Sequence, residues 1–392
     1  MIALLTRILG RLPIGWLQLR HNPGRLAAAT AGVAFAIVLV FVQLGLSGSL
    51  KETVVRSYRL FDPDLLVVSA TDSDGLGDGS RLPRSRLYQA LGHPEITAGA
   101  PLHVGRASWL TEAGDTVALA VYAVAPDHRG VFRADLEAAL APLSMLDAAL
   151  TDRRTRSLDM GRFEGASPEA PVPFELQGRQ LQAVGAFTLG GDFTGDGGLL
   201  VSEQTFLRLL PGRVAGAPNH LLLRLKPGAD PARVAAEVSA LLGEDAATVR
   251  PMAQAMAIAA DVQLRDRPMG IIFGFGVMIG ITVGIVVAYQ VLATDVADHL
   301  SEYATFKAMG YPRRFFAGIV MEEAVVLGVL GFIPGILLTQ LFYDALMRQA
   351  NLPLFMTAER AVAVFVGTLV ACSLSGILAL RRVDAADPAD LF

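Results

Sequence analysis

The 392-residue sequence is poor in charged residues and holds a single cysteine. Charged residues make up 18% of the chain, against about a quarter in ordinary globular domains, so an ordinary soluble protein is disfavoured. A net charge of −4 gives no excess of basic residues, which argues against nucleic acid as a partner. The lone Cys372 excludes a disulfide framework, a CxxC redox pair and a cysteine zinc site. Intrinsic disorder is excluded because 53% of the residues are hydrophobic.

Motifs for catalysis and cofactor binding are also missing. None of the three lysines (Lys51, Lys226 and Lys307) follows a glycine, so the chain has no phosphate-binding loop for ATP. The histidines lie outside the long apolar runs, and none forms the HExxH zinc motif. We therefore expect no catalytic residues, no metal site and no cofactor bound by this chain.

The hydrophobic residues are gathered in four long runs. A helix needs about 20 apolar residues to cross the hydrocarbon core of a membrane, and each run is close to that length or longer. One such run could be a buried core helix, but four together favour transmembrane helices. The first run starts too far from the N-terminus for a cleaved signal peptide. The runs are 26–46, 269–293, 315–343 and 361–380.

A long segment of different character separates the first two runs. Residues 47–268 are numerous enough for a folded extramembrane domain. A β-branched run with alternation predicts a strand at 117–124, and the segments 64–69 and 220–225 also predict short strands. Asp230-Pro231 predicts the start of a helix. We therefore predict an α-helical membrane protein with four transmembrane helices and a large α+β domain inserted between helices 1 and 2.

Basic residues give the orientation of these segments. Lys and Arg are more frequent in the termini and in the loop 294–314 than in the short loop 344–360, which favours cytoplasmic termini and an outer domain. The predicted segments are an interfacial N-terminal helix (1–25), the first transmembrane helix (26–46), the α+β domain (47–268), the second transmembrane helix (269–293), a cytoplasmic loop (294–314), the third transmembrane helix (315–343), a short outer loop (344–360), the fourth transmembrane helix (361–380) and a cytoplasmic tail (381–392).

Small residues recur every four positions in two of the runs. In a membrane, this spacing allows two helices to approach each other closely. We therefore predict close helix packing through these positions. They are Ala28, Gly32 and Ala36 in the first run, and Gly276, Gly280 and Gly284 in the second.

The third run contains a helix breaker and two acidic residues. Pro334, followed by Gly335, removes a helical hydrogen bond, which predicts a kink. Glu322 and Glu323 lie nearer the cytoplasmic end of the run. Charges within a membrane segment are costly and often functional. Pairing with headgroups or loops is the simpler interpretation, and proton coupling stays open.

The loop 294–314 predicts one short helix between two spans. Ser301 is a candidate N-cap for a helix over 302–309, and Gly310 with Pro312 predicts its end. Such a helix could be a plain connector. It could also fit a cleft in a separate cytosolic ATPase, with Tyr303, Phe306 and Met309 as anchors.

Six stretches of the chain carry a family resemblance: 13–45, 84–92 (RSRLYQALG), 185–203, 301–311 (SEYATFKAMGY), 331–335 (GFIPG) and 387–390 (DPAD). Together they resemble the DevC-type permeases of the wider MacB and FtsX group of ABC transporter permeases. The combination is specific, whereas 301–311 alone is of a type that related permeases share.

This resemblance implies a permease subunit of a tripartite export system in the bacterial inner membrane, with the large domain in the periplasm. It implies a homodimer, a DevA-like ABC ATPase subunit, a DevB- or HlyD-like membrane-fusion adaptor and a TolC-like outer-membrane channel. The cargo would be lipid-like or amphiphilic, as in glycolipid export. MacB carries a fused ATPase domain and this sequence does not, so ATP hydrolysis is expected in a separate subunit. The implied ATPase-coupling residues are Glu302, Tyr303, Thr305, Phe306, Lys307, Met309 and Tyr311.

Two other functions remain open for such a chain. An FtsX-like protein would regulate a periplasmic cell-wall hydrolase, and a third kind of permease would release lipoproteins. FtsX outer domains are typically smaller than residues 47–268, so the size of this domain favours export.

Overall fold

The computed structural model describes residues 13–70, 75–79, 81–111, 114–243, 245–350 and 352–385. The first twelve residues of the predicted interfacial helix and the predicted tail from 386 onward lie outside this range. The chain divides into two compact units. The helical unit comprises residues 1–48, 271–347 and 354–392, and the sheet unit comprises residues 49–270 and 348–353.

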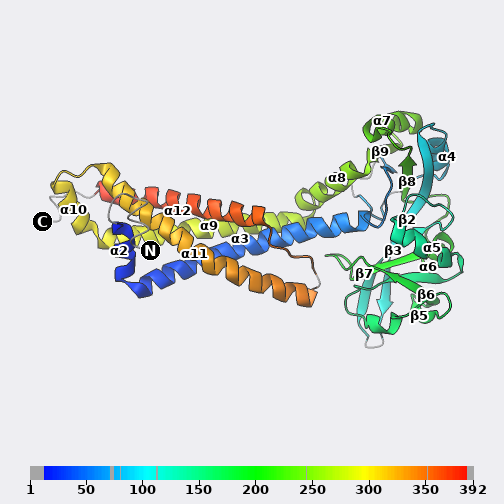
Figure 1. Cartoon of the computed structure of the whole chain (residues 1–392), viewed down its shortest axis with the longest axis horizontal. Helices are drawn as coiled ribbons and strands as arrows, with labels where there is room; N and C mark the ends of the chain where they lie inside the picture. The colour runs from blue at the N-terminus through cyan, green and yellow to red at the C-terminus, as the bar shows by residue number, and fades with distance from the viewer. Residues whose placement is uncertain are drawn as a thin grey trace. The chain divides into compact units, whose positions relative to one another are not determined.

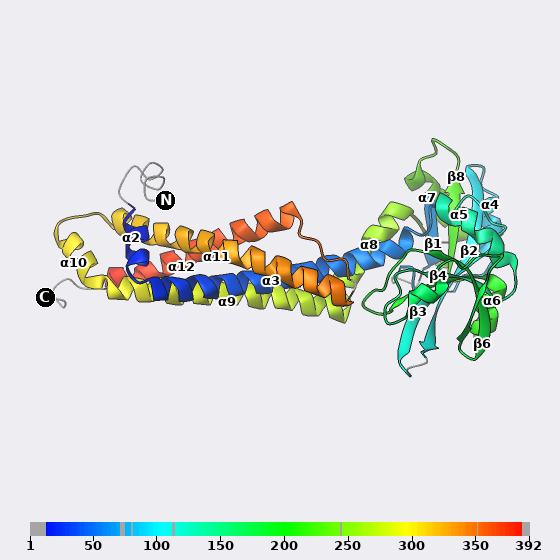
Figure 2. The same cartoon turned by 60° about the horizontal axis from the view of Figure 1, so that its bottom comes forward.

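Long helices that run alongside one another build the helical unit (Figures 1 and 2). Among the described residues, four helices are long and apolar enough to cross a membrane: α3, α9, α11 and α12. The unit draws on α2 (Ile14–His21), α3 (Pro23–Tyr58), α9 (Pro268–Asp298), α10 (Leu300–Ala308), α11 (Arg313–Ala350) and α12 (Ala358–Ala385).

The helices do not stop where the apolar runs stop. Helix α3 continues to Tyr58, well past the apolar run 26–46, so residues 47–58 are helical. Residues such as Lys51 and Glu52 are good helix formers, so the backbone hydrogen bonds continue after the hydrophobic pattern has ended. Helix α11 likewise continues through Pro334.

A nine-stranded mixed sheet forms the sheet unit, in the order β5-β6-β4-β7-β3-β2-β8-β1-β9. The pairs β3–β7 and β4–β6 are parallel, and the other neighbouring pairs are antiparallel. The strands are β1 (Leu65–Ser69), β2 (Ile96–Leu110), β3 (Thr116–Val124), β4 (Ala148–Asp152), β5 (Val172–Leu176), β6 (Arg179–Phe187), β7 (Gly197–Ser202), β8 (His220–Leu225) and β9 (Ala247–Pro251).

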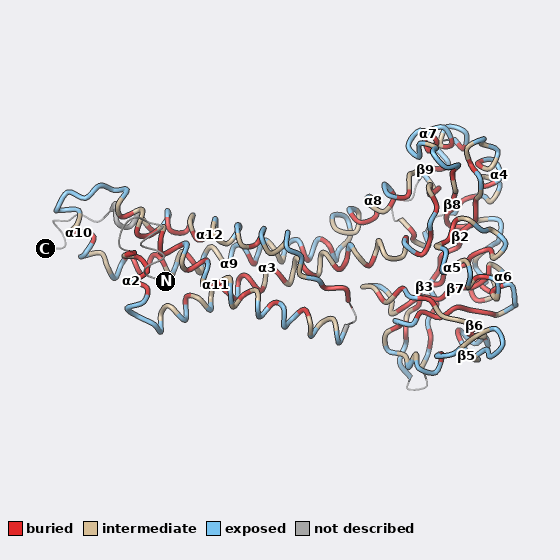
Figure 3. Tube along the Cα trace, in the orientation of Figure 1, coloured by how far each residue is buried: buried red, intermediate tan, exposed pale blue. Residues whose placement is uncertain are grey.

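The long strand β2 joins the two halves of this sheet. Its first half, from Ile96 to Leu102, pairs with β8, and its second half, from His103 to Leu110, pairs with β3. Buried residues follow the strands and the facing sides of the helices (Figure 3). The shorter elements of the unit are α4 (Ser85–Leu91), α5 (Ala134–Leu140), η1 (Ala141–Ser144), η2 (Met160–Phe163), α6 (Glu203–Leu209), α7 (Pro231–Leu242) and α8 (Met252–Arg265).

Local sequence signals in this unit have the expected structural outcome. The three predicted strands are observed as β1, β3 and β8. Helix α7 begins after Asp230, whose carboxylate accepts a hydrogen bond from the amide of Ala232 at 3.0 Å. The predicted helix start and the mixture of strands and helices are therefore confirmed.

Candidate functional site

The short helix between α9 and α11 is the strongest candidate site that the sequence offers. Helix α10 spans Leu300–Ala308, and His299 precedes it as the N-cap without a side-chain hydrogen bond. Ser301 therefore lies inside the helix, and its predicted role as N-cap is wrong. The amide of Tyr303 donates to the carbonyl of His299 at 3.0 Å, so the helical hydrogen bonds already begin before Ser301.

The predicted end of this helix is confirmed. Gly310 has a φ of 87°, a left-handed conformation that suits glycine. Its amide donates to the carbonyl of Lys307 at 3.0 Å, and the amide of Tyr311 donates to the carbonyl of Phe306 at 3.1 Å. These two bonds form a Schellman motif, and the rings of Phe306 and Tyr311 pack across it with centroids 5.5 Å apart.

The inner face of α10 is fixed to the neighbouring helices. Tyr303 is 1% exposed, and its ring packs on Phe316 of α11. Phe306 is half-buried and contacts Phe315. Burial, together with the carboxylates of Glu323 and Asp295, raises the pKa of the Tyr303 phenol. Tyr303 is therefore not available as an exposed anchor, and its predicted contact with a partner is replaced by packing within the chain.

The outer face of α10 is open. Glu302, Thr305 and Met309 are exposed and lie at helical spacing on one side, and Met309 is 59% exposed. Lys307 and Tyr311 are exposed as well. Of the seven residues expected to couple to an ATPase, five are thus exposed, Phe306 is half-buried and Tyr303 is buried.

A buried polar cluster lies where α2, α3, α9 and α11 meet. The amide of Trp16 in α2 donates to Glu322 Oε1 at 3.2 Å. Arg25 in α3 forms an ion pair with Asp298 and lies 3.6 Å from Asp295 Oδ1. Glu323 is fully buried, and neither of its carboxylate oxygens has a hydrogen-bond partner within the described ranges. Glu322 was predicted to pair with headgroups or loops, and in the structure it accepts a hydrogen bond from the backbone of the helix α2.

Gly15 explains why α2 can lie on α11 at this point. A Cβ atom at position 15 would lie 2.8 Å from the carbonyl oxygen of Ile319 and 2.9 Å from the side chain of Glu323. Only a residue without a side chain allows this approach. Gly15, Trp16 and Arg25 were not predicted as members of a site. The sequence offered one signal for this contact, which is the pair Gly15 and Trp16 ahead of a long apolar run.

The small residues of α3 and α9 face one another along the helical unit. A Cβ atom at Gly280 would lie 2.8 Å from Val40 Cγ2, and one at Gly284 would lie 3.3 Å from the Cβ of Ala36. Gly32 lies against Val287, and Gly276 lies against Gln43. Gly335, beside Pro334, lies against Ile37 of α3. These glycines therefore sit at the contacts of α3 with α9 and α11.

Potential metal ligands are not clustered in the described part of the chain. In that part, no group of three or more His, Cys, Asp or Glu residues is placed to hold a metal ion.

Comparison with known proteins identifies the C-terminal part of the chain. Residues 272–388 match the family described as FtsX-like permease C-terminal. No curated protein matches the sequence. One matching solved structure is the periplasmic region of MacB from Actinobacillus actinomycetemcomitans, with 11% identity over 50% of this chain and 92% of that chain, at a TM-score of 0.32.

A second is the extracellular domain of the noncanonic ABC-type transporter YknZ from Gram-positive bacteria, with 11% identity over 47% of this chain and 98% of that chain, at a TM-score of 0.33. Similarity at this level carries no argument about the sheet unit. The match to the C-terminal family confirms the FtsX-like resemblance, and the DevC subtype stays a prediction. The residues similar to this family comprise most of α9 and the whole of α10, α11 and α12.

Proposed function

We propose that the chain is the membrane subunit of an ATP-driven export system, in which a separate ABC ATPase docks on α10. In this proposal α3, α9, α11 and α12 span the bacterial inner membrane and the sheet unit lies in the periplasm. Large apolar side chains exposed on these helices support the placement, among them Phe275 and Leu337. A second copy of the chain, a membrane-fusion adaptor and a TolC-like channel complete the proposed machine, which expels a lipid-like or amphiphilic substrate.

The division of α10 into a packed face and an open face carries this proposal. A plain connector between two helices has no need of a buried aromatic side chain on one side and an unpartnered apolar one on the other. Tyr303 fixes α10 to α11, while Met309, the residue that caps the C-terminal end of α10, is exposed. A partner that binds the exposed face of α10 would therefore bind a helix that is packed firmly against the long helix α11.

The contacts beyond α10 extend this connection. Phe316, which packs against Tyr303, lies about one turn before Val320 and about two turns before Glu323 on α11. The charges acting on Glu323 come from Asp295 of α9, Glu322 and Arg25 of α3. A displacement of α10 would thus act on three of the long helices at one end. We infer that this junction transmits the motion of the ATPase.

Co-purification tests the docking step. The tagged chain would be purified from its native membrane, and its ATPase partner would be detected by mass spectrometry and by ATP hydrolysis in the eluate. Met309→Asp should reduce the recovered ATPase about thirtyfold, since losing a central contact commonly costs about 2 kcal/mol. Purified chain free of the partner should not hydrolyse ATP.

Met145→Asp is the matched control, because Met145 is exposed in the sheet unit and the substitution is the same. It should leave the recovered ATPase unchanged. If the Met309→Asp chain is present in the membrane at normal levels and still co-purifies with the full amount of ATPase, α10 is only a connector and the proposal is wrong.

A further inference from the structure

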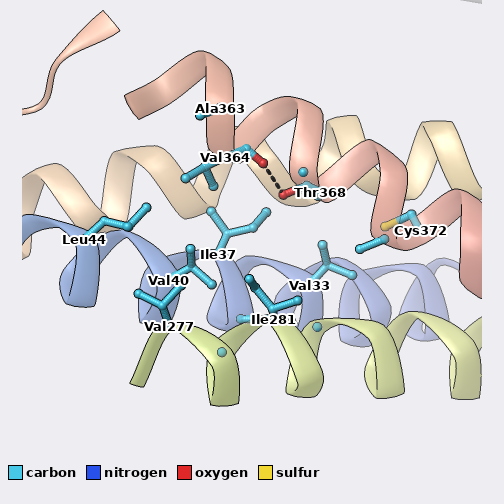
Figure 4. Close-up of a pocket in the computed structure, with 15 residues that line it drawn as sticks. Val33, Ile37, Val40, Leu44, Val277, Ile281, Ala363, Val364, Thr368 and Cys372 are labelled. Atoms are coloured by element: carbon cyan, nitrogen blue, oxygen red, sulfur yellow. Dashed lines mark hydrogen bonds between the residues drawn. The ribbon is translucent and has the colours of Figure 1, made fainter. Parts of the chain in front are cut away.

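An apolar pocket of about 260 Å³ lies among α3, α9 and α12 in the helical unit (Figure 4). Its walls are formed by Ile37 and Val40 of α3, Val277 and Ile281 of α9, and Val364 and Cys372 of α12. The hydroxyl of Thr368, a polar group in the wall, donates to the carbonyl of Val364 at 2.8 Å, so it is already satisfied. The pocket therefore offers contacts to an apolar ligand and almost none to water.

Small residues on one wall of the pocket leave this space open. Helix α12 lines the pocket with Ala363, Gly367 and Ala371. A Cβ atom at Gly367 would meet nothing within 4 Å. Helix α12 is held to α9 beyond the pocket, where the hydroxyl of Ser375 donates to the carbonyl of Ile285 at 3.0 Å. Small residues on α12, on the side of Ser375 toward the start of the helix, leave a wedge between α12 and its neighbours α3 and α9.

The positively charged side chain of Arg360 lies near the end of the wedge that is farther from Ser375. Arg360 precedes the pocket residue Ala363 by about one turn of α12. It is half-buried, and its Nη1 donates to the carbonyl of Phe355 at 2.9 Å. Along α12, Arg360 and Cys372 are about 18 Å apart at the rise of an α-helix. That distance is close to the length of an extended fatty-acyl chain.

We propose that a phospholipid of the surrounding bilayer occupies this site, with one acyl chain in the wedge and its phosphate on Arg360. The inference rests on the proposed membrane placement of α3, α9 and α12. An apolar cavity of about 150 Å³ stays free of water and takes apolar ligands, and this pocket is larger. Arginine suits the phosphate because its planar guanidinium forms paired hydrogen bonds with phosphate oxygens.

The bound chain completes the packing of α12. Without it, the walls would lose the dispersion contacts that a filled interior provides. The lipid therefore acts as a spacer that sets how far α12 stands from α3 and α9. An occupant of this kind links the position of α12 to the membrane.

Photolabelling tests the site in the full-length chain. The chain would be reconstituted in nanodiscs of phosphatidylglycerol and phosphatidylcholine, with phosphatidylglycerol carrying a diazirine on one acyl chain as the probe. Adducts mapped by mass spectrometry should fall on Val277, Ile281, Val364 and Cys372. Gly367→Phe, which fills the pocket, should reduce these adducts at least tenfold.

Gly274→Phe is the matched control, because Gly274 also has nothing within 4 Å of an added Cβ but does not line the pocket. It should leave the pocket adducts unchanged. Arg360→Gln keeps the pocket and should lower the adducts several-fold. Should Gly367→Phe fail to accumulate, Arg360→Gln decides the matter, since unchanged labelling in that variant overturns the proposal.

Failure of the proposed lipid site and failure of the proposed membrane placement would give different labelling patterns. Adducts confined to outward residues such as Phe275 and Leu374 would overturn the lipid site and leave the membrane placement intact. The absence of adducts on every one of the four long helices would remove the membrane placement itself. Cross-linking between two copies through Cys372, without lipid adducts, would assign the wedge to a second copy and overturn the proposal.

Discussion

Tyr303 of α10 and Phe316 of α11 pack edge to face, with ring centroids 5.8 Å apart and ring planes inclined by 72°. The ring of Tyr303 contributes more to this contact than its hydroxyl does. The hydroxyl lies 3.5 Å from Gln18 Oε1, which is the limit of a hydrogen bond, whereas the side chain as a whole is 1% exposed. The position therefore requires an aromatic ring rather than a phenol.

Truncating this ring should destabilise the helical unit. Tyr303→Ala removes a buried aromatic side chain and should lower the free energy of unfolding by roughly 3–5 kcal/mol. Tyr303→Phe keeps the ring and should change it by less than about 1 kcal/mol. Thermal unfolding of the purified chain in detergent would measure both variants. Equal stability of the two would show that the ring contact does not hold α10.

The α3–α9 contact gives a second prediction, through two glycines of one helix. Gly280→Val should lower stability by about 1–3 kcal/mol, because the new side chain would clash with Val40 and push the helices apart. Gly274→Val is the control, since that position faces open space. The same thermal measurement should show no loss for Gly274→Val. If both variants melt alike, helix propensity rather than packing governs α9.

A third prediction concerns acid stability of the sheet unit. Arg84 Nη1 lies 2.7 Å and 2.9 Å from the two carboxylate oxygens of Glu203, and His103 Nε2 lies 3.3 Å from Oε1. Burial alone would raise the pKa of Glu203, but the hydrogen bonds from His103 and Arg84 outweigh it and lower the pKa. A lowered pKa in the folded state means stability that is present above the unfolded value of about 4.3. That stability is lost as the pH falls through the folded value.

Glu203→Gln should therefore cost about 1–3 kcal/mol at neutral pH, and the difference from the unsubstituted chain should shrink below about pH 4. Fluorescence of Trp109 would report unfolding of the sheet unit in a Trp16→Phe background, because Trp109 lies in its core. Glu175→Gln, at an exposed position of β5, should show no such pH dependence. A constant difference down to pH 3 would contradict the role of the charge.

A fourth prediction fixes the orientation of the proposed membrane protein. Single cysteines at Met145 and Ser301, both exposed, would be placed in a Cys372→Ser background. An impermeant thiol reagent should label position 145 in intact spheroplasts and position 301 only after the membrane is permeabilised. The reverse pattern would invert the orientation, and labelling of both in intact spheroplasts would contradict it as well.

Hydropathy and local turn chemistry made much of this fold accessible from the sequence. The four apolar runs lie within α3, α9, α11 and α12, because the requirement for about 20 apolar residues is a property of the run itself. Gly310 marked the end of α10 because a left-handed residue after a helix is a local preference. Such signals need no knowledge of what the helix packs against.

Burial of the polar residues was not accessible in the same way. Trp16 and Glu322 meet across 306 positions of sequence, so no local pattern announces their hydrogen bond. Tyr303 was predicted to be an exposed anchor, because the sequence of α10 is only weakly amphipathic and does not show which face is buried. The packing of Tyr303 on Phe316 of α11 determines the buried face. Which side chains of α10 are buried therefore follows from the tertiary contacts and not from the local sequence.

The contact between Gly32 and Val287 also sets an order of events during synthesis. About 250 residues separate these partners, and at roughly 5–20 residues per second a ribosome needs some tens of seconds to make them. The strands of the sheet unit, which end at Pro251, are complete before α9 emerges. Helix α3 is therefore made before its partner α9, and the small residues that contact α9 stay uncovered while the sheet unit folds. A chain that is interrupted before α9 leaves that face exposed, and such an unfinished product is a target for quality-control proteases.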